Sequence, residues 1–177
     1  MSIGPRVLVV GTSGSGKSVL AARLARALGG PHVELDEFQH GPDWSQSSVD
    51  ELRDRTAAAI AGRDVWVVDG NYSDVRDLLW PRATTLVWLD YSRPVVMVRV
   101  VRRSVVRVVT RRELWNGNRS DWRRWGDPDH PIRWAWRTHA ANRMKYEGLV
   151  TLPEWSHLEV VRLRRPAEAR SLLSWTG

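Results

Sequence analysis

Cysteine is absent from the 177 residues, so the chain can form neither a disulfide nor a thiolate metal site. Long apolar runs are absent as well, because arginines interrupt even the valine-rich stretch 95–109. We therefore expect no membrane-spanning segment and no membrane partner. The residues before the first glycine-rich stretch are too few for a signal peptide. Together these absences favour a cytoplasmic protein.

Lysine is nearly absent: the chain has only Lys17 and Lys145, and arginine supplies almost all of its positive charge. The formal net charge of +7 favours anionic partners such as nucleotides, nucleic acid or phosphorylated metabolites. Genome base composition would explain the surplus arginine equally well. Because lysine is so rare, Lys17 within a glycine-rich segment stands out from the background composition.

Strand-length apolar runs alternate with segments that are typical of helices. The runs are 6–10, 32–35, 65–68, 85–89 and 158–163. Such alternation predicts parallel strands joined by right-handed crossovers. We therefore expect an α/β fold of three layers around a five-stranded parallel sheet. The length suits one domain over 1–177.

Helices are expected between these runs. Ser48 and Glu51 form a Ser-x-x-Glu capping box that predicts the start of one of them. The expected helices are 17–28, 49–62, 94–112, 131–147 and one that begins at 166.

The helix expected over 94–112 carries arginines at four-residue spacing. This spacing places Arg99, Arg103 and Arg107 on one face. The remaining apolar residues of the helix are expected to turn elsewhere and pack, namely Val98, Val101, Val105 and Val108. Residues 113–130 have no sustained apolar period, which indicates a long functional loop.

The segment 11–18 matches the phosphate-loop pattern Gly-x-x-x-x-Gly-Lys-Ser, between a predicted strand and a predicted helix. Its glycines let successive backbone N–H groups point at phosphate oxygens. Lys17 is expected to reach the β- and γ-phosphates, and the Ser18 hydroxyl to coordinate magnesium. The pattern therefore predicts ATP and Mg²⁺ as cofactors. The predicted nucleotide-binding residues of this segment are Gly11, Ser13, Gly14, Ser15, Gly16, Lys17, Ser18 and Val19.

Asp69 follows the apolar run 65–68, a pattern in which a carboxylate beside the phosphate loop holds magnesium through water. The alternative is an aspartate that opens a turn with Gly70. Asp36 is expected to end the second strand at the carboxyl edge of the sheet, where it could accept the proton of an attacking hydroxyl. The alternative there is a helix or turn cap. Glu34 is expected to point to the opposite face.

No Asn-Lys-x-Asp motif for guanine is present, and the chain is too short for a motor or transporter ATPase domain, which leaves small kinases as the leading class. The sequence resembles the adenylate-kinase-related P-loop kinases, and among them the DNA topology modulation proteins. The matching segments are 11–18, 32–36, 42–44, 66–72, 99–103 and 112–119. Asn71-Tyr72 stands where adenylate kinases have Pro-Arg, so a nucleoside monophosphate is not the expected acceptor.

The resemblance implies a nucleoside-monophosphate-kinase-like fold with a lid at about 112–130. Arg99 and Arg103 match the Arg-x-x-x-Arg pair that opens the lid and stabilises the transferred phosphoryl group. Further candidates by the same resemblance are Arg119 in the lid, Arg133 and Arg137 on the returning helix, and Arg164, which would stack on adenine. The predicted catalytic residues are Lys17, Asp36, Arg99, Arg103 and Arg119.

Two interpretations remain for the tryptophans interleaved with these arginines: a stacking platform for bases, or rings that anchor the lid and pack the returning helix. They are Trp115, Trp122, Trp125, Trp134 and Trp136. His130 and His139 lack metal-ligand spacing.

The favoured function is an ATP-dependent phosphotransferase whose small-molecule acceptor carries a hydroxyl, such as a nucleoside or a polyol. The alternatives are an ATP-binding protein with weak ATPase activity that acts on DNA, and a nucleotide-dependent regulatory partner of another protein. Nucleic acid is a possible but less favoured partner, and the sequence carries no signal for an oligomeric state.

Overall fold

A five-stranded, all-parallel sheet organises the chain, as the sequence predicts. The computed structural model describes residues 3–110, 116 and 130–174. The strands run in the order β2-β3-β1-β4-β5, so the strand that leads into the glycine-rich loop is central. They are β1 (Arg6–Gly11), β2 (His32–Glu34), β3 (Trp66–Asp69), β4 (Thr85–Leu89) and β5 (Glu159–Leu163).

Helices connect these strands, and the long ones match the predicted segments. They are α1 (Lys17–Leu28), α2 (Leu35–Gln39), α3 (Val49–Ile60), α4 (Arg76–Leu79), α5 (Arg93–Val109), α6 (Pro131–Leu149) and α7 (Pro166–Ser174). The Ser48 side chain caps α3 by accepting a hydrogen bond from the Glu51 amide at 3.1 Å. The second strand is shorter than predicted: it ends at Glu34, and Asp36 lies in the unpredicted helix α2.

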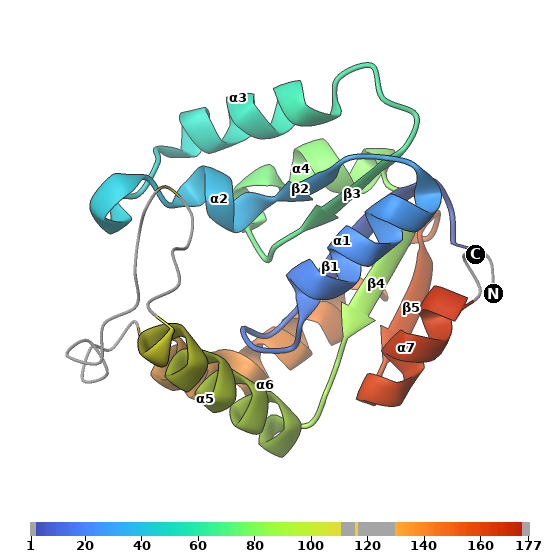
Figure 1. Ribbon diagram of the computed structural model, residues 1–177. Coiled ribbons are helices and arrows are strands. Elements are labelled where there is room, and N and C mark those ends of the chain that lie inside the picture. Colours follow the sequence, from blue (N-terminus) through green and yellow to red (C-terminus); the bar gives the residue numbers. More distant parts are fainter. Residues whose placement is uncertain (1–2, 111–115, 117–129, 175–177) are drawn as a thin grey trace.

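The core has two layers because side chains alternate between the faces of each strand. Val7 and Val9 of β1 pack in a cluster with residues of α1, α5 and α7, whereas Leu8 and Val10 pack with α3 and α4. Figure 1 shows α3 and α1 on opposite sides of the sheet, with α5 and α6 side by side at its edge. The fold is thus a three-layer arrangement that holds β1 and its loop in the centre.

Helix α5 differs from the prediction in which side it buries. Its buried residues are Val96, Val100 and Ser104. The valines expected to pack are instead exposed: Val98 by 69%, Val101 by 39% and Val105 by 41%. Only one face of a helix can pack on the glycine-rich loop, and in α5 that face carries Val96, Val100 and Ser104. The three exposed valines lie on other faces.

The predicted lid, 112–130, lies outside the described residues except for Asn116 and His130. The Asn116 amide donates to the backbone carbonyls of Glu37, at 3.4 Å, and of His40. His130 caps α6, where its Nδ1 accepts from the Ile132 amide at 3.4 Å. Within the described part of the chain, no helix is long and apolar enough to cross a membrane.

Candidate active site

The glycine-rich loop joins β1 to α1 at the carboxyl edge of the sheet. Gly14 and Gly16 have φ values of +87° and +95°, which side-chain-bearing residues rarely adopt. Gly16 precedes α1 without a side-chain cap, and the first turn of α1 has no acidic residue. The Ser15 hydroxyl is buried without a hydrogen-bond partner. Uncapped amides and an unpartnered hydroxyl at a helix N-terminus suit a phosphate chain.

Helix α5 supports this loop from one side. A Cβ on Gly14 would lie 2.8 Å from the Val100 Cβ, so the loop and the helix are in close contact. Arg99 Nη1 donates to the Ser15 carbonyl at 2.8 Å, and its guanidinium lies 5.2 Å from the centre of the buried Tyr91 ring. His139 Nε2 lies 2.9 Å from the Tyr91 carbonyl oxygen. Arg99 therefore holds the loop, and its predicted role toward the phosphoryl group stays a prediction.

Arg103 is the arginine of α5 that lies among the site carboxylates. Its Nη2 donates to the Ser13 hydroxyl at 3.1 Å, and its Nε is buried without a partner. Burial, together with the charge of Arg107, lowers the pKa of Arg103 to about 10, against the opposing charges of Asp36 and Glu34. The group stays cationic at neutral pH, and its unpartnered donor is available to an anion.

Ser18 lies between two carboxylates. Its Oγ is 2.8 Å from Oε1 of Glu34 and 2.7 Å from Oδ2 of Asp69. The expectation that Glu34 faces away is therefore wrong, because Glu34 is in register with Asp69 on the neighbouring strand. A single hydroxyl hydrogen cannot serve two carboxylates at once. A site with several oxygen acceptors and too few hydrogen-bond donors suits a hard cation such as Mg²⁺.

His32 is a site residue that sequence reasoning missed. Its Nε2 lies 2.9 Å from Oδ1 of Asp69. Burial acts to lower the pKa of His32, but the hydrogen bond and charge of Asp69, with the charges of Glu34 and Glu37, raise it above the ordinary value. The two-residue spacing of His32 and Glu34 on a strand was the available signal, since it places both on one face.

Lys17 and Asp36 are close enough for their charges to interact, although Asp36 lies in helix α2 and not at a strand end. Burial lowers the pKa of the Lys17 ammonium, and the carboxylates of Asp36 and Asp69 act in the opposite direction. The Tyr72 hydroxyl donates to Oδ1 of Asp36 at 2.8 Å. Burial and the charge of Asp36 also raise the pKa of Tyr72, so Tyr72 is neutral and remains a donor. Sequence reasoning had placed the 69–72 turn beside the acceptor and noted Tyr72 as a departure from the adenylate-kinase pattern, but had not paired it with Asp36.

Asn71 ties the turn after β3 to the beginning of the loop. Its Nδ2 donates to the Gly11 carbonyl at 2.7 Å, and its Oδ1 accepts from the Gly11 amide at 3.2 Å. The buried Tyr146 hydroxyl of α6 also donates to this Oδ1, at 3.0 Å. The Asn71-Tyr72 pair thus connects the loop to Asp36.

The other predicted residues fall into three groups. Arg119, Trp115, Trp122 and Trp125 lie outside the described residues. Trp134 and Trp136 are 45% and 56% exposed, which leaves both interpretations of these two rings open. They face Arg137 at 5.6 Å and Arg93 at 4.9 Å. Val19, Arg133 and Arg164 are exposed, and their predicted roles stay predictions. The backbone amide of Arg164 donates to the Glu168 carboxylate.

No group of three histidine, aspartate or glutamate side chains able to hold a metal ion occurs in the part of the chain that the structure describes. A magnesium ion at Ser18 and Asp69 would therefore take most of its ligands from phosphate oxygens and water. That is the usual situation for Mg²⁺ bound together with a nucleotide.

Comparison with solved structures identifies the fold. The shikimate kinase from Acinetobacter baumannii in complex with shikimate superposes with a TM-score of 0.56 at 14% identity, over 97% of this chain and 90% of that one. A gluconokinase from Sinorhizobium meliloti 1021 superposes with a TM-score of 0.53 at 20% identity, over 99% and 93%. No protein-family model and no curated protein sequence matches the chain. The chain therefore has the fold of P-loop kinases along nearly its whole length.

Proposed function

We propose that this protein is an ATP-dependent kinase that transfers the terminal phosphoryl group to a hydroxyl of a small molecule. The observation that carries the proposal is the Asp36 carboxylate, which Tyr72 fixes near Lys17 and the glycine-rich loop. A protein that only bound nucleotide would need the loop but not a carboxylate held beside it. The kinase fold, shared over nearly the whole chain, supports the same conclusion.

The donor half of the site is the loop with its neighbours. The amides at the start of α1 would bind the phosphates, and Lys17 would contact the β- and γ-phosphate oxygens. Ser18 and Asp69 would hold Mg²⁺, which offsets negative charge on the phosphates. Arg103 would donate from its unpartnered Nε to the same group of oxygens.

The acceptor half is built around Asp36. Tyr72 occupies Oδ1, and no described residue hydrogen-bonds Oδ2, which leaves that oxygen for the hydroxyl of an acceptor. Asp36 would orient this hydroxyl and receive its proton as the oxygen attacks phosphorus. A phosphate acceptor would instead be repelled by Asp36 and its acidic neighbour Glu34. Of the two structural neighbours, one is a shikimate kinase in complex with shikimate and the other is a gluconokinase, so both are small-molecule kinases by name.

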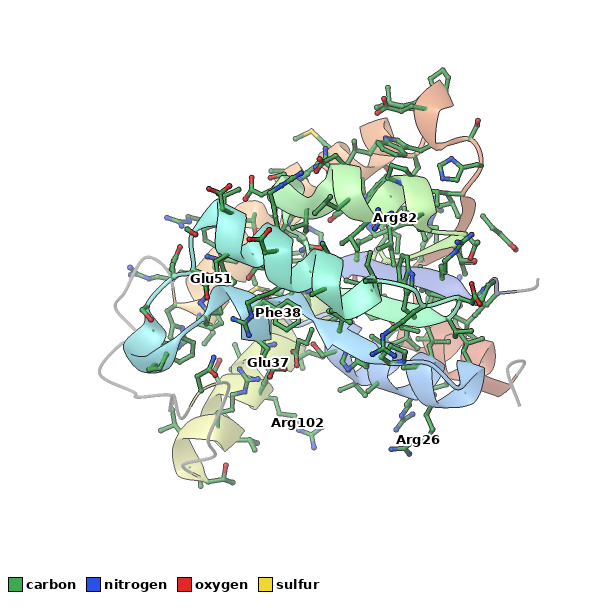
Figure 2. All side chains as sticks on the ribbon, turned by 90° about the horizontal axis from the view of Figure 1, so that it is seen from above. Arg26, Glu37, Phe38, Glu51, Arg82 and Arg102 are labelled. Atoms are coloured by element: carbon green, nitrogen blue, oxygen red, sulfur yellow. The ribbon has the colours of Figure 1, made fainter. Side chains whose placement is uncertain are left out.

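The segment that follows α2 contains a residue in an uncommon backbone conformation. Trp44 has a φ of +60°, an uncommon conformation for a large side chain, and its ring meets His40 edge-on at 5.8 Å. Strained residues of this kind concentrate at ligand sites. Figure 2 shows Phe38 lying against α3, where Arg55 covers its ring at 4.5 Å. This packing fixes α2, and with it Asp36.

The finer assignments belong to the same proposal. The segments 66–72 and 112–119 resemble the DNA topology modulation proteins, and we propose that the chain belongs to that group with ATP and Mg²⁺ as cofactors. A small-molecule acceptor is preferred over nucleic acid, since the Asp36 carboxylate would repel a backbone phosphate placed beside it. A cytoplasmic location agrees with the lack of cysteine.

The test is acceptor-stimulated release of ADP by the purified chain with ATP and Mg²⁺. The panel should contain sugars, sugar acids, polyols, nucleosides and aminoglycoside-like alcohols. We expect at least one compound to raise the rate well above the basal hydrolysis, with the loss of that stimulation in Asp36→Asn. Stimulation by single-stranded or duplex DNA alone would instead favour a DNA-dependent ATPase.

A further inference from the structure

We propose a second anion site, separate from the nucleotide loop, in a groove at the amino edge of the sheet that takes a small phosphorylated molecule. The groove has a volume of about 730 Å³. Three arginines from distant parts of the chain line it: Arg6, Arg63 and Arg82. The glycine-rich loop lies at the opposite, carboxyl edge, so the two sites would be occupied independently.

The fold brings the three arginines together because all of them lie where strands begin. Arg6 is the first residue of β1 and pairs in register with Trp66, the first residue of β3. Arg63 lies in the turn between α3 and β3, and Arg82 ends the short helical turn before β4. Figure 2 shows Arg82 next to α4. The small side chains of Ala57 and Ala58 on α3, and of Ala61 directly after it, leave the space between the arginines open.

The charges in the groove are unbalanced. Asp64 is the single acidic residue of its lining, against three guanidinium groups. Among the described residues, none of the three arginines forms an ion pair with a carboxylate. Arginines elsewhere do so closely: Arg53 with Asp77 at 2.7 Å, and Arg162 with Asp90 at 2.6 Å. The groove therefore keeps a positive charge that an anion would neutralise.

Arg6 supplies the second observation. Its Nε is buried yet has no hydrogen-bond partner. A buried donor without an acceptor costs free energy, so the Arg6 guanidinium would gain from an anionic oxygen placed beside it. A guanidinium group binds two phosphate oxygens at once through two parallel N–H donors. Three guanidinium groups around one groove therefore suit a phosphate ligand better than a carboxylate ligand, which has only two oxygens.

The size and walls of the groove indicate what else the ligand contains. A volume of about 730 Å³ lies within the range of small-molecule sites and exceeds what one phosphate fills. The buried Ile60 and Trp66 form apolar parts of the lining. A phosphate or diphosphate joined to a compact organic group fits this combination.

The test uses pyrophosphate as the probe and the full chain with Lys17→Ala, so that binding at the glycine-rich loop is suppressed. Calorimetry is expected to show one saturable site. Arg6→Gln and Arg82→Gln should each weaken it about tenfold, because each removes a charged hydrogen bond. Arg82 is exposed, so its replacement tests the site even if Arg6→Gln does not fold. The matched control is Arg26→Gln on the exposed side of α1, which should bind unchanged.

Amide chemical shifts locate the binding event. Pyrophosphate should shift the resonances of 60–66 and 82–84 and leave those of 12–18 in place. The proposal is overturned if binding does not saturate by about 10 mM pyrophosphate, because such an affinity is far weaker than a metabolite site requires. It is also overturned if Arg63→Gln and Arg82→Gln bind like the parent protein. Arginine-dependent binding of a single-stranded oligonucleotide without pyrophosphate binding would overturn the small-molecule assignment in favour of nucleic acid.

Discussion

The Tyr72 hydroxyl donates a 2.8 Å hydrogen bond to Oδ1 of Asp36. The two residues come from different elements, Asp36 from α2 and Tyr72 from the turn after β3. The side chain of Asn71, next to Tyr72, forms hydrogen bonds with both the amide and the carbonyl of Gly11. The proposed acceptor carboxylate is thereby positioned relative to the first glycine of the phosphate loop, which links the two halves of the site through one turn.

Replacing Tyr72 with phenylalanine should lower kcat/KM for the acceptor about tenfold, because the Asp36 carboxylate loses a hydrogen bond that fixes its orientation. The KM for ATP should stay unchanged. Steady-state kinetics with each substrate varied in turn makes the measurement. The unfolding midpoint of the variant serves as the control, and an equal loss for both substrates would argue against an acceptor-specific role.

Lys17→Ala should reduce phosphoryl transfer by a factor on the order of 100 to 1,000, because one preorganised positive charge at the transferred group is lost. The chain offers a matched control in Lys145, its only other lysine, which lies on α6. Lys145→Ala should retain activity close to the parent protein. Equal losses in the two variants would mean that the rate tracks net charge rather than the loop.

Arg99→Ala should destabilise the fold by about 2 kcal/mol, since it removes a charged hydrogen bond to the Ser15 carbonyl and the contact with the Tyr91 ring. The exposed Arg102, visible on α5 in Figure 2, provides the control. Arg102→Ala should change the free energy of unfolding by less than about 0.5 kcal/mol. Denaturant titrations of the two variants compare them directly, and indistinguishable midpoints would refute the supporting role of Arg99.

The raised pKa of His32 makes a pH-dependent contribution to stability, measured with EDTA present so that no cation competes at Asp69. Folding favours the protonated imidazole, so the contribution is complete below pH 6.5 and is lost as the pH rises through the higher pKa of the folded state. The difference in unfolding free energy between the parent and His32→Gln should therefore shrink above pH 6.5. A difference that grew with pH would contradict the assigned pairing.

The sheet and the glycine-rich loop could be predicted because their signals are local. Apolar runs mark β1, β3, β4 and β5, and a short motif between a strand and a helix marks the loop. The capping box at Ser48 likewise depends only on neighbouring residues.

The missed features depend on tertiary contacts. The side of Glu34 follows from its register with Asp69 across two strands, which no local pattern contains. Asp36 lies in a five-residue helix too short to show a period. The site roles of Tyr72 and His32 follow from their contacts with Asp36 and Asp69, which belong to other elements. The buried side of α5 follows from the contact of Val100 with Gly14, and the pattern of valines alone does not show which of them make it.

The most direct test of the central claim is the identity of the phosphorus product. ³¹P NMR of a reaction with ATP, Mg²⁺ and the acceptor that stimulates ADP release should show a new phosphomonoester resonance that grows with ADP. The same reaction with Asp36→Asn should give little of this signal. If inorganic phosphate is the only new product with every acceptor, and Asp36→Asn produces it at the parent rate, the protein is a nucleotide hydrolase and the account of its acceptor site is wrong.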